Sequence, residues 1–475
     1  MVSDPGVLDL SFRTGLRRLN AAGRLCKVSS KVDPDLELAS IVRRHDSNLA
    51  FWFERVGDHP LPLCCNVLVS HPNVLAVFGL DTHGVRACLE RAIARPLPLR
   101  PVAQGACQEV VISDGINLEA LFPVLHHMPK DAGKVITGGV IIAKDPETGV
   151  RNASIHRLQL VGPDRTAIKL DLGRHLRAYY EKAKARGRPL EIAAVIGADL
   201  SLTYAASMMG AQIPLDQDEL AVAGGLRGAP LEVVPCRTVD LEVPAEAEFV
   251  IEAEILPDET VWEGPFLEFI GLYSEPGWAP VVRVKAVTHR RDPIYYAIIG
   301  AETRVLRKYV MEALIERAVR ASVPIVTDVN LTPGGLCRFH LVMAVRKRSP
   351  QDEGLQRNAV FAAVAALKDL DLVIVVDDDI DIHNPADVEY ALATRMEASQ
   401  DLFLLPGARG HEYILVSEGG LRGVRTKVGI DATVPYDELP NFRRVEPLKL
   451  DLAAYEAATD PRPPGHPAFT EAPPT

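Results

Sequence analysis

The chain has 475 residues, of which 47% are hydrophobic and 24% are charged. These proportions are ordinary for a folded globular protein and exclude a collagen-like fibre or a wholly disordered chain. At about 150 residues per domain, the length leaves room for roughly three domains. The 52 basic and 63 acidic residues give a formal net charge of −11, so no general attraction for nucleic acid is expected.

The seven cysteines contain no CxxC pair, and their number is odd. Such a set does not resemble a disulfide framework or a cysteine-built zinc site. The N-terminal sequence MVSDPGVLDLSFRTG lacks the basic and apolar parts of a secretory signal. The most apolar long window, 192–215, is interrupted by Asp199 and Gln212, so it does not resemble a membrane span. We therefore expect a cytoplasmic protein that does not associate with membranes.

Residues 1 to about 95 alternate helix-like and strand-like segments, and a first domain is placed at 1–109. An amphipathic helix is expected over 8–22, and short strands are expected over 49–56 and 61–69. Three prolines between 95 and 101 indicate a linker at the end of this domain.

Residues 110–300 contain recurring short runs rich in β-branched residues, with one helix predicted over 174–186. Many short strands at such spacing are typical of a barrel or sandwich of mostly antiparallel strands. The runs lie at 134–142, 231–234, 249–255 and 281–287.

The segment 301–322 is predicted to be a connecting helix, and residues 323–459 are predicted to form a C-terminal α/β domain. Within this domain, Asn384 is expected to cap a helix that has Pro385 at its first position. The tail 460–475 holds six prolines in sixteen residues and is predicted to be disordered. The other elements expected in this domain are strands over 339–345 and 372–376 and a helix over 355–367.

Several common catalytic motifs are absent, including GxGxxG, the Walker loop, HExxH and GxSxG. The usual nicotinamide, nucleotide triphosphate, zinc-protease and serine-hydrolase sites therefore have no support. The acidic run 377–381 could hold magnesium, although such a run more often marks the polar end of a strand. The glycine-rich run 224–228 could approach a ligand, although it is more often a turn.

Two glutamates, Glu263 and Glu268, flank a Gly-Pro-Phe-Leu segment. Because Gly-Pro does not continue a helix, both are expected on extended or turn backbone. Apolar neighbours such as Trp262 and Phe266 favour the protonated carboxyl that a general acid requires. From these residues alone, a pair that flanks a surface turn is the commoner alternative.

The sequence Glu263-Gly264-Pro265-Phe266, followed by Glu268 and by Gly-Leu-Tyr at 271–273, resembles the signature of the UbiD-type decarboxylases. These enzymes use prenylated FMN. Other parts of the chain resemble the family in the same order, and together they make the resemblance specific over about residues 5 to 445. They are Asn-Ala-Ser-Ile-His-Arg at 152–157, His175, Glu219 before Ala-Gly-Gly at 223–225, and Lys-Val-Gly-Ile-Asp-Ala-Thr at 427–433.

The resemblance implies a reversible, non-oxidative decarboxylase of an aromatic, heteroaromatic or α,β-unsaturated carboxylic acid. Loss of CO2 from an sp2 carbon leaves a carbanion that no side chain stabilises well, so the flavin is expected to be the electron sink. Glu268 matches the proton donor, and Glu263 and Arg157 match its partners. Arg157 can also hold the substrate carboxylate through its fork of donors.

The resemblance also implies a metal ion that links the protein to the flavin phosphate. Asn152, His175 and Glu219 match the ligands, and this oxygen and nitrogen set suits manganese or magnesium. Potassium is implied at 205–208, although Ala206 stands where some relatives have a serine. The implied flavin-binding residues are Asn152, Ser154, Ile155, His156, Arg157, His175, Met208, Glu219 and Lys427.

The implied fold is α+β and multidomain. An N-terminal α/β domain precedes a central split β-barrel that binds flavin, and a C-terminal α/β domain serves oligomerisation as a dimer or a hexamer. A flavin prenyltransferase is the expected supplier of the cofactor. Two alternatives stay open, which are an acid/base hydrolase built on Glu263 and Glu268 and a degenerate flavin-binding assembly subunit.

Overall fold

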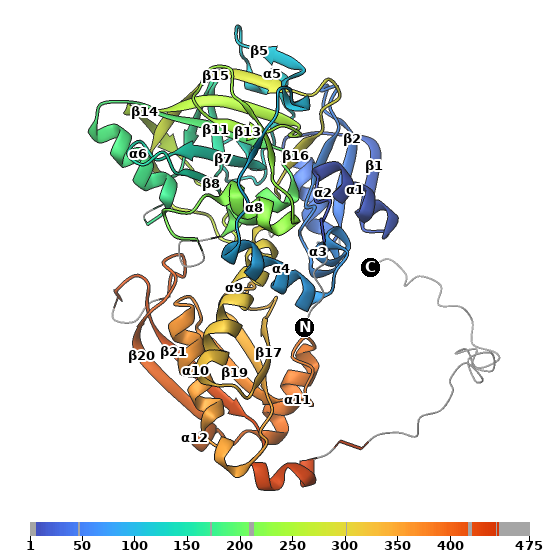
Figure 1. The fold of residues 1–475 in the computed structure, drawn as a ribbon, viewed down its shortest axis with the longest axis vertical. Coiled ribbons are helices and arrows are strands. Elements are labelled where there is room, and N and C mark those ends of the chain that lie inside the picture. The colour runs from blue at the N-terminus through green and yellow to red at the C-terminus, as the bar shows by residue number, and fades with distance from the viewer. Residues whose placement is uncertain are drawn as a thin grey trace, which may run out of the picture.

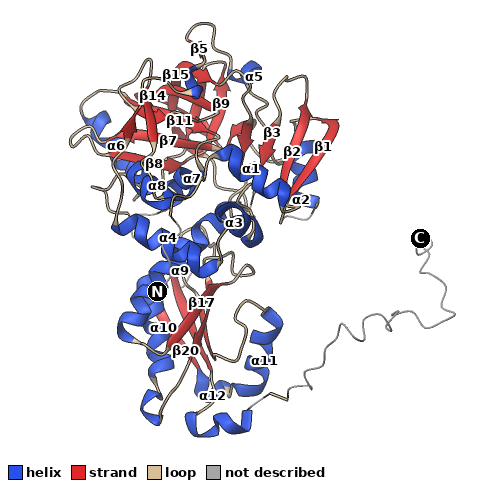
Figure 2. Cartoon of the chain, turned by 45° about the vertical axis from the view of Figure 1, so that its right-hand side comes forward, coloured by secondary structure: helices blue, strands red, loops and turns tan. Residues whose placement is uncertain are grey.

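The computed structural model describes residues 6–45, 48–171, 173–208, 213–300, 302–416, 420–442 and 444–445. The tail predicted at 460–475 lies outside the described residues. Figures 1 and 2 show the N-terminal and central segments side by side, with the C-terminal segment below them and helix α9 (Glu302–Ser322) at the junction. One hydrophobic core extends through the N-terminal and central segments, whereas the C-terminal sheet has its own clusters.

The N-terminal segment packs helices against a four-stranded sheet in the order β1-β2-β3-β16. The predicted first helix and first strand are confirmed as α1 (Phe12–Ala21) and β2 (Ala50–Val56). The strand predicted over 61–69 is shorter, because β3 (Leu63–Cys65) ends where Asn66 takes a left-handed backbone with φ 58°. The other elements are β1 (Leu25–Val32), α2 (Glu37–Arg44), α3 (His71–Phe78), α4 (Thr82–Ala94) and β16 (Tyr295–Ala297).

The central segment is built on a nine-stranded sheet in the order β6-β9-β10-β15-β14-β11-β7-β8, with β5 paired to β15. Every pairing within it is antiparallel, which confirms the strand arrangement predicted from the sequence. Among the described strands no closed barrel forms, because the two end strands, β6 and β8, do not pair with each other. The strands are β5 (Val110–Ile112), β6 (Val135–Ile136), β7 (Gly139–Lys144), β8 (Arg151–Ile155), β9 (Leu158–Gly162), β10 (Arg165–Ile168), β11 (Leu190–Ile196), β14 (Phe249–Glu263) and β15 (Gly277–His289).

A smaller sheet in the order β13-β12-β4 lies beside this one. The predicted linker contributes one of its strands, β4 (Arg100–Pro101), which pairs in parallel with β12 (Glu232–Pro235). The remaining elements of the central segment are η1 (Ala106–Gln108), α5 (Leu118–Leu121), α6 (His175–Ala185), α7 (Leu200–Ser207), α8 (Glu219–Arg227) and β13 (Glu242–Pro244).

The interpretation of run 224–228 as a turn is wrong. Gly224 and Gly225 lie inside α8, and only Gly228 has the left-handed backbone of a helix C-cap. The reason is close packing between α8 and the end of α4. A Cβ on Gly225 would lie 2.8 Å from the carbonyl oxygen of Arg95 and 3.0 Å from that of Ala92.

The C-terminal segment contains a five-stranded sheet in the order β17-β18-β19-β21-β20. As predicted, the Asn384 side chain caps α11, which begins at Pro385. The acidic run follows the end of β19, and Arg395 pairs with both Asp377 and Asp379, so the polar strand end is confirmed. The elements are β17 (Val326–Leu331), β18 (His340–Val345), η2 (Pro350–Asp352), α10 (Leu355–Ala366), β19 (Leu372–Asp377), α11 (Pro385–Arg395), α12 (Ala398–Asp401), β20 (Leu402–Arg409), β21 (Val424–Ala432) and η4 (Tyr436–Phe442).

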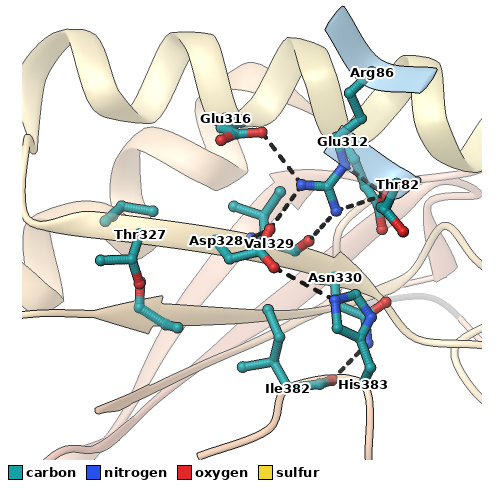
Figure 3. Close-up of polar contacts among 12 residues, drawn as sticks. Thr82, Arg86, Glu312, Glu316, Thr327, Asp328, Val329, Asn330, Ile382 and His383 are labelled. Atoms are coloured by element: carbon teal, nitrogen blue, oxygen red, sulfur yellow. Dashed lines mark hydrogen bonds and ion pairs between the residues drawn. The ribbon is translucent and has the colours of Figure 1, made fainter. Parts of the chain in front are cut away.

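A buried ion cluster joins these parts at α9 (Figure 3). Arg86 of α4 donates to Glu312 of α9 at 3.2 Å and to Asp328 of β17 at 2.7 Å. It also donates to the Val329 carbonyl oxygen at 2.7 Å. Burial alone would raise the pKa of Asp328, but a hydrogen bond with His383 and the charge of Arg86 lower it instead. One arginine thereby connects α4 of the N-terminal segment to α9 and β17, which lie more than 200 residues later in the chain.

In the part of the chain that the structure describes, no helix is long and apolar enough to cross a bilayer.

Candidate active site

The two predicted glutamates lie on one folded loop. Glu263 ends β14, and Glu268 lies in a narrow turn in which its amide N–H donates to the Leu272 carbonyl oxygen at 2.8 Å. The amide of Gly264 donates to the Gln159 side chain at 2.8 Å, which fixes the entry to the loop. The prediction of extended or turn backbone is therefore confirmed.

Arg157 joins both carboxylates. Its Nε and Nη2 donate to the two Glu263 oxygens at 2.7 and 3.1 Å, and its Nη1 donates to Glu268 Oε1 at 2.7 Å. Burial alone would lower the pKa of Arg157, but the bonds and charges of the two glutamates raise it above its usual value. The guanidinium also lies over the Phe266 ring, with Cζ 4.8 Å from the centroid. Arg157 is thus held in one position, between the two carboxylates.

The immediate surroundings of the glutamates are more polar than the sequence suggests. The Trp262 side chain is half exposed and packs edge-on against Trp278. The polar neighbours are Ser274, whose Oγ accepts from Arg157 at 3.1 Å, and Lys169, whose Nζ lies 3.8 Å from Glu268. Sequence reasoning missed both residues, although Ser274 directly follows the recognised Gly-Leu-Tyr segment.

The three predicted metal ligands meet at one point. Asn152 lies on β8, His175 is the first residue of α6, and Glu219 is the first residue of α8. Asn152 Nδ2 lies 2.8 Å from Glu219 Oε1, and His175 Nδ1 lies 3.7 Å from the same oxygen. Among the described residues, no cluster of three or more His, Cys, Asp or Glu side chains is arranged to hold a metal, so the asparagine oxygen would be the third ligand here.

The donors of this cluster fit a hard or borderline cation. Glu219 is only 5% exposed, and burial raises the pKa of its carboxyl. The Ala153 amide donates to its second oxygen at 3.0 Å, which orients the carboxylate. A buried carboxylate held by an amide, next to an imidazole, would gain from a cation that takes up its charge.

Three other predicted flavin-binding residues continue β8. Ser154 Oγ bonds to Asn152 Oδ1 at 3.1 Å, and Ile155 and His156 line a cavity. Burial lowers the pKa of His156 to about 4, so its ring is neutral, and Nδ1 bonds to the Lys169 carbonyl oxygen at 3.1 Å.

Six of the nine predicted flavin-binding residues are not among the residues that line this cavity, namely Asn152, Ser154, His175, Met208, Glu219 and Lys427. Met208 follows the last turn of α7 and is half-buried. Lys427 is fully buried in β21, where its Nζ lies 3.0 Å from Asp371 and donates to the Lys368 carbonyl oxygen at 2.9 Å. The charge of Lys427 is therefore already paired within the C-terminal segment.

The cavity has a volume of about 990 Å³ and lies between the central and C-terminal segments. Arg157 and Glu268 form part of its central wall, whereas His411 and Tyr413 belong to its C-terminal wall. Tyr413 Oη donates to Asp171 at 3.1 Å, a contact that bridges the two walls. The sequence pattern gave no signal for this contact, because the two residues are separated by 242 positions.

Known protein families match most of the chain, including the residues that form this site. The N-terminal, Rift-related and C-terminal domains of 3-octaprenyl-4-hydroxybenzoate carboxy-lyase, known as UbiD, match residues 16–91, 100–303 and 304–432 respectively. The chain belongs to the UbiD family of decarboxylases.

Three UbiD relatives illustrate the extent of the similarity. Anhydromevalonate phosphate decarboxylase of Methanothermobacter thermautotrophicus is 37% identical over 420 residues, covering 88% of this chain and 96% of the relative. The UbiD-class enzyme HmfF of Pelotomaculum thermopropionicum, solved with FMN, has 40% identity and a TM-score of 0.88, covering 94% of this chain and 99% of that one. The apo 3,4-dihydroxybenzoic acid decarboxylase of Enterobacter cloacae has 29% identity and a TM-score of 0.88, covering 95% and 100%.

Membership of the UbiD family decides between the open alternatives. The chain is a carboxy-lyase, so the hydrolase alternative based on Glu263 and Glu268 is not supported. The complete network of Arg157 with both glutamates also argues against a degenerate subunit.

Proposed function

We propose that this UbiD enzyme catalyses the reversible, non-oxidative decarboxylation of an aromatic, heteroaromatic or α,β-unsaturated carboxylic acid with prenylated FMN. The observation that carries the proposal is Arg157 bonded to both Glu263 and Glu268 at the wall of a large cavity. The HmfF relative has been solved with FMN and, in an evolved dimeric form, with prenylated FMN.

The residues present fit such a flavin. The cavity of about 990 Å³ has room for a flavin together with a small acid, and residues 155–157 form part of its wall. Asn152, His175 and Glu219 would hold manganese or magnesium, and the metal would bind the flavin phosphate. When bound, prenylated FMN supplies the electron sink for the carbanion that forms as CO2 leaves.

The side chains of this enzyme then orient the acid and move the proton. Arg157 positions the carboxylate of the substrate without binding it tightly, because two glutamates already share its charge. Glu268 donates a proton to the carbon that has lost CO2 and recovers it from solvent, which a partly exposed carboxyl allows. Glu263 keeps Arg157 in place through two bonds.

Potassium beside the cofactor phosphate is part of this proposal, at residues 205–208. The side chain of Ser207 donates to the Tyr204 carbonyl oxygen at 2.7 Å, and Ala206 has no side-chain oxygen. Potassium would therefore rely on backbone carbonyl groups.

We also propose the domain roles that the family resemblance implies. Residues 1–109 form the N-terminal α/β domain, and 110–300 form the flavin-binding domain, with the topology of a split barrel. The helix of 301–322 connects them to the C-terminal domain of 323–459, which forms the contacts of a cytoplasmic homo-oligomer, either a dimer or a hexamer. Light scattering of the purified enzyme would measure the oligomeric state.

The decisive test is cofactor dependence. The chain would be produced with and without a flavin prenyltransferase, and CO2 release would be measured over a panel of aromatic and unsaturated acids. We expect activity only in the co-produced enzyme, because ordinary FMN lacks the modified ring. Full activity with FMN alone, or activity without bound flavin, would contradict the proposal.

A further inference from the structure

Three arginines that follow Arg157 in the sequence line the same cavity. Arg174 precedes α6, Arg307 lies on α9, and Arg338 lies between β17 and β18, and all three line the cavity that contains Glu268. Arg338 is ion-paired with Asp369 at 2.6 Å. Within the described residues, no carboxylate lies within ion-pair distance of Arg307, and its buried Nε has no hydrogen-bond partner.

The loop that carries Arg338 is held in an uncommon conformation. Leu336 and Cys337 both have left-handed backbone, with φ of 58° and 53°, although neither is a glycine. The Cys337 amide donates to the Thr332 carbonyl oxygen at 2.9 Å and closes the turn. This turn places the Arg338 guanidinium 5.3 Å from the centroid of the Phe269 ring, next to Glu268 in the sequence. Strained backbone of this kind persists where a functional side chain must be aimed.

The arginine cluster has three cationic side chains, and of the two nearby carboxylates Asp369 already pairs with Arg338 while Asp171 lies near Arg307. Burial, followed by the charges of Arg338 and Arg174, lowers the pKa of Arg307 to about 9, so the side chain is still cationic at neutral pH. The nearby carboxylate of Asp171 accepts hydrogen bonds from Tyr413, at 3.1 Å to each oxygen. Arg307 is half-buried, with a buried Nε that has no hydrogen-bond partner, and a bound anion would offset the cost of removing this cation from water.

Arg157 is not expected to bind the substrate carboxylate strongly. Three of its hydrogen bonds go to Glu263 and Glu268, so little of its charge is left for a second carboxylate. Binding energy from a remote part of a substrate can compensate for weak contacts at the reacting group.

We propose that Arg307, supported by Arg174 and Arg338, binds a second anionic group of the substrate, a carboxylate or a phosphoryl group remote from the carboxylate that is lost. This inference rests on the proposed function and narrows its substrate class from simple acids to acids with two anionic groups. Arg307 is then a specificity-determining residue that touches the substrate.

The test compares ligands that differ only in the second anion. Binding of benzoate, isophthalate, terephthalate and 4-phosphonobenzoate to the flavin-loaded enzyme would be measured by titration calorimetry at neutral pH. We expect at least one dianionic probe to bind roughly 10-fold or more tightly than benzoate, since a hydrogen bond to a charged group is worth about that much. The phosphonate arm separates a phosphoryl preference from a carboxylate preference.

The variants Arg307→Met and Arg307→Lys test whether Arg307 causes the tighter binding of dianionic probes. Arg307→Met should remove most of the advantage of the dianionic probe and change benzoate affinity less than about 2-fold, while Arg307→Lys should keep part of the advantage. The control is Arg422→Met at the rim of the same cavity, where the arginine is already paired with Glu275 at 3.2 Å. The control should keep the full advantage.

Several outcomes would overturn the proposal. Equal affinity for all four probes in the wild-type enzyme would do so, as would an equal loss for benzoate and the dianionic probes in both Arg307 variants. Loss of bound flavin in Arg307→Met would assign the cluster to the cofactor phosphate instead. Because binding is measured without turnover, a selective but inactive enzyme would contradict only the proposed function, and an active enzyme without selectivity would contradict only this inference.

Discussion

Glu268 and Glu263 are chemically identical side chains that meet the same arginine in different ways. Glu263 is 3% exposed and accepts two bonds from Arg157, whereas Glu268 is 15% exposed and accepts one. The carboxylate with fewer bonds and more access to the cavity is the better proton carrier, because it can exchange its proton with substrate and solvent. The geometry therefore supports Glu268 as the acid and Glu263 as the support of Arg157.

We expect Glu268→Gln to lose roughly 10²-fold or more of kcat, because the amide keeps the contact with Arg157 but has no acidic proton. Bound flavin and benzoate affinity should stay close to wild type. The kcat from steady-state kinetics and the rate of solvent-deuterium incorporation into the product should fall together. The control is Glu275→Gln on the same loop region, which should retain kcat. Near-normal turnover of Glu268→Gln would move the acid role to another group.

The proposed metal ligands Asn152, His175 and Glu219 give a second prediction for a single residue. Glu219→Gln keeps the size of the side chain but removes the charge that a divalent ion needs, so metal and flavin content should fall together. Elemental analysis and the flavin spectrum measure the two quantities separately. The control is Glu181→Gln at an exposed position of α6, and this variant should keep both metal and flavin. Full flavin occupancy without metal would disprove the bridging role of the ion.

At this scale, a recognisable order of a few residues identified side chains that the structure brings together. Asn152 and Glu219 are 67 positions apart, yet the structure brings them within 2.8 Å. The arginine cluster was not predicted, because Arg174, Arg307 and Arg338 come from three segments and no local pattern links them. Lys427 shows the opposite case, since its motif was recognised while the structure pairs its charge with Asp371.

At the scale of elements, the packing of α8 positions Glu219, one of the proposed metal ligands. The first residue of α8 is Glu219, and the glycines near the C-terminal end of this helix allow α4 to approach closely. Any shift of α8 along this contact would move the carboxylate that faces Asn152. The sequence alone suggested a turn here, because a glycine pair breaks helices more often than it permits helix contacts.

We expect Gly225→Ala to destabilise the protein by about 1–3 kcal/mol, because the added methyl would overlap backbone atoms at the end of α4. The displacement should also weaken metal binding, which thermal melts with and without added manganese would reveal as a smaller stabilisation. Gly277→Ala is the matched control, since nothing lies within 4 Å of the added carbon. Equal melting temperatures for both variants would rule out tight packing at α8.

Helix α9 shows why amphipathic patterns fail for some elements. Tyr309 of this helix is buried, and the charged residues Lys308 and Glu312 are buried as well. Lys308 Nζ lies 2.8 Å from Glu312, and this ion pair lets charged residues occupy the interior. A helix that contacts both halves of the molecule buries several faces, so its sequence does not separate into one apolar and one polar side.

At the scale of the whole molecule, the cavity has walls from two independently packed parts. The central and C-terminal segments have separate hydrophobic clusters, and the cavity lies between them. Their relative position therefore decides the distance between Glu268 and the arginine cluster. Sequence analysis predicted the class of each part, but not their relative position, because that depends on contacts between residues far apart in the chain.

The Arg86 cluster is the contact best placed to fix this arrangement (Figure 3). The Arg86 side chain is 4% exposed and is ion-paired with Glu312, Glu316 and Asp328. Removing one partner from a buried ion cluster leaves uncompensated charge and costs about 3–5 kcal/mol. Because Lys308 still neutralises Glu312, we expect Arg86→Met to lie at the low end, at about 3 kcal/mol.

Arg86→Met should therefore melt several degrees below wild type and, while folded, bind substrate acids more weakly because the two cavity walls are no longer held together. Differential scanning calorimetry measures the first effect, and KM at full flavin occupancy measures the second. Arg346→Met is the matched control, since Arg346 is 61% exposed and its pair with Asp378 is accessible to solvent. A raised KM in Arg86→Met with an unchanged melting temperature would show that the cluster positions the C-terminal wall without stabilising it. An unchanged melting temperature together with an unchanged KM would mean that other contacts fix the relative position of the central and C-terminal segments.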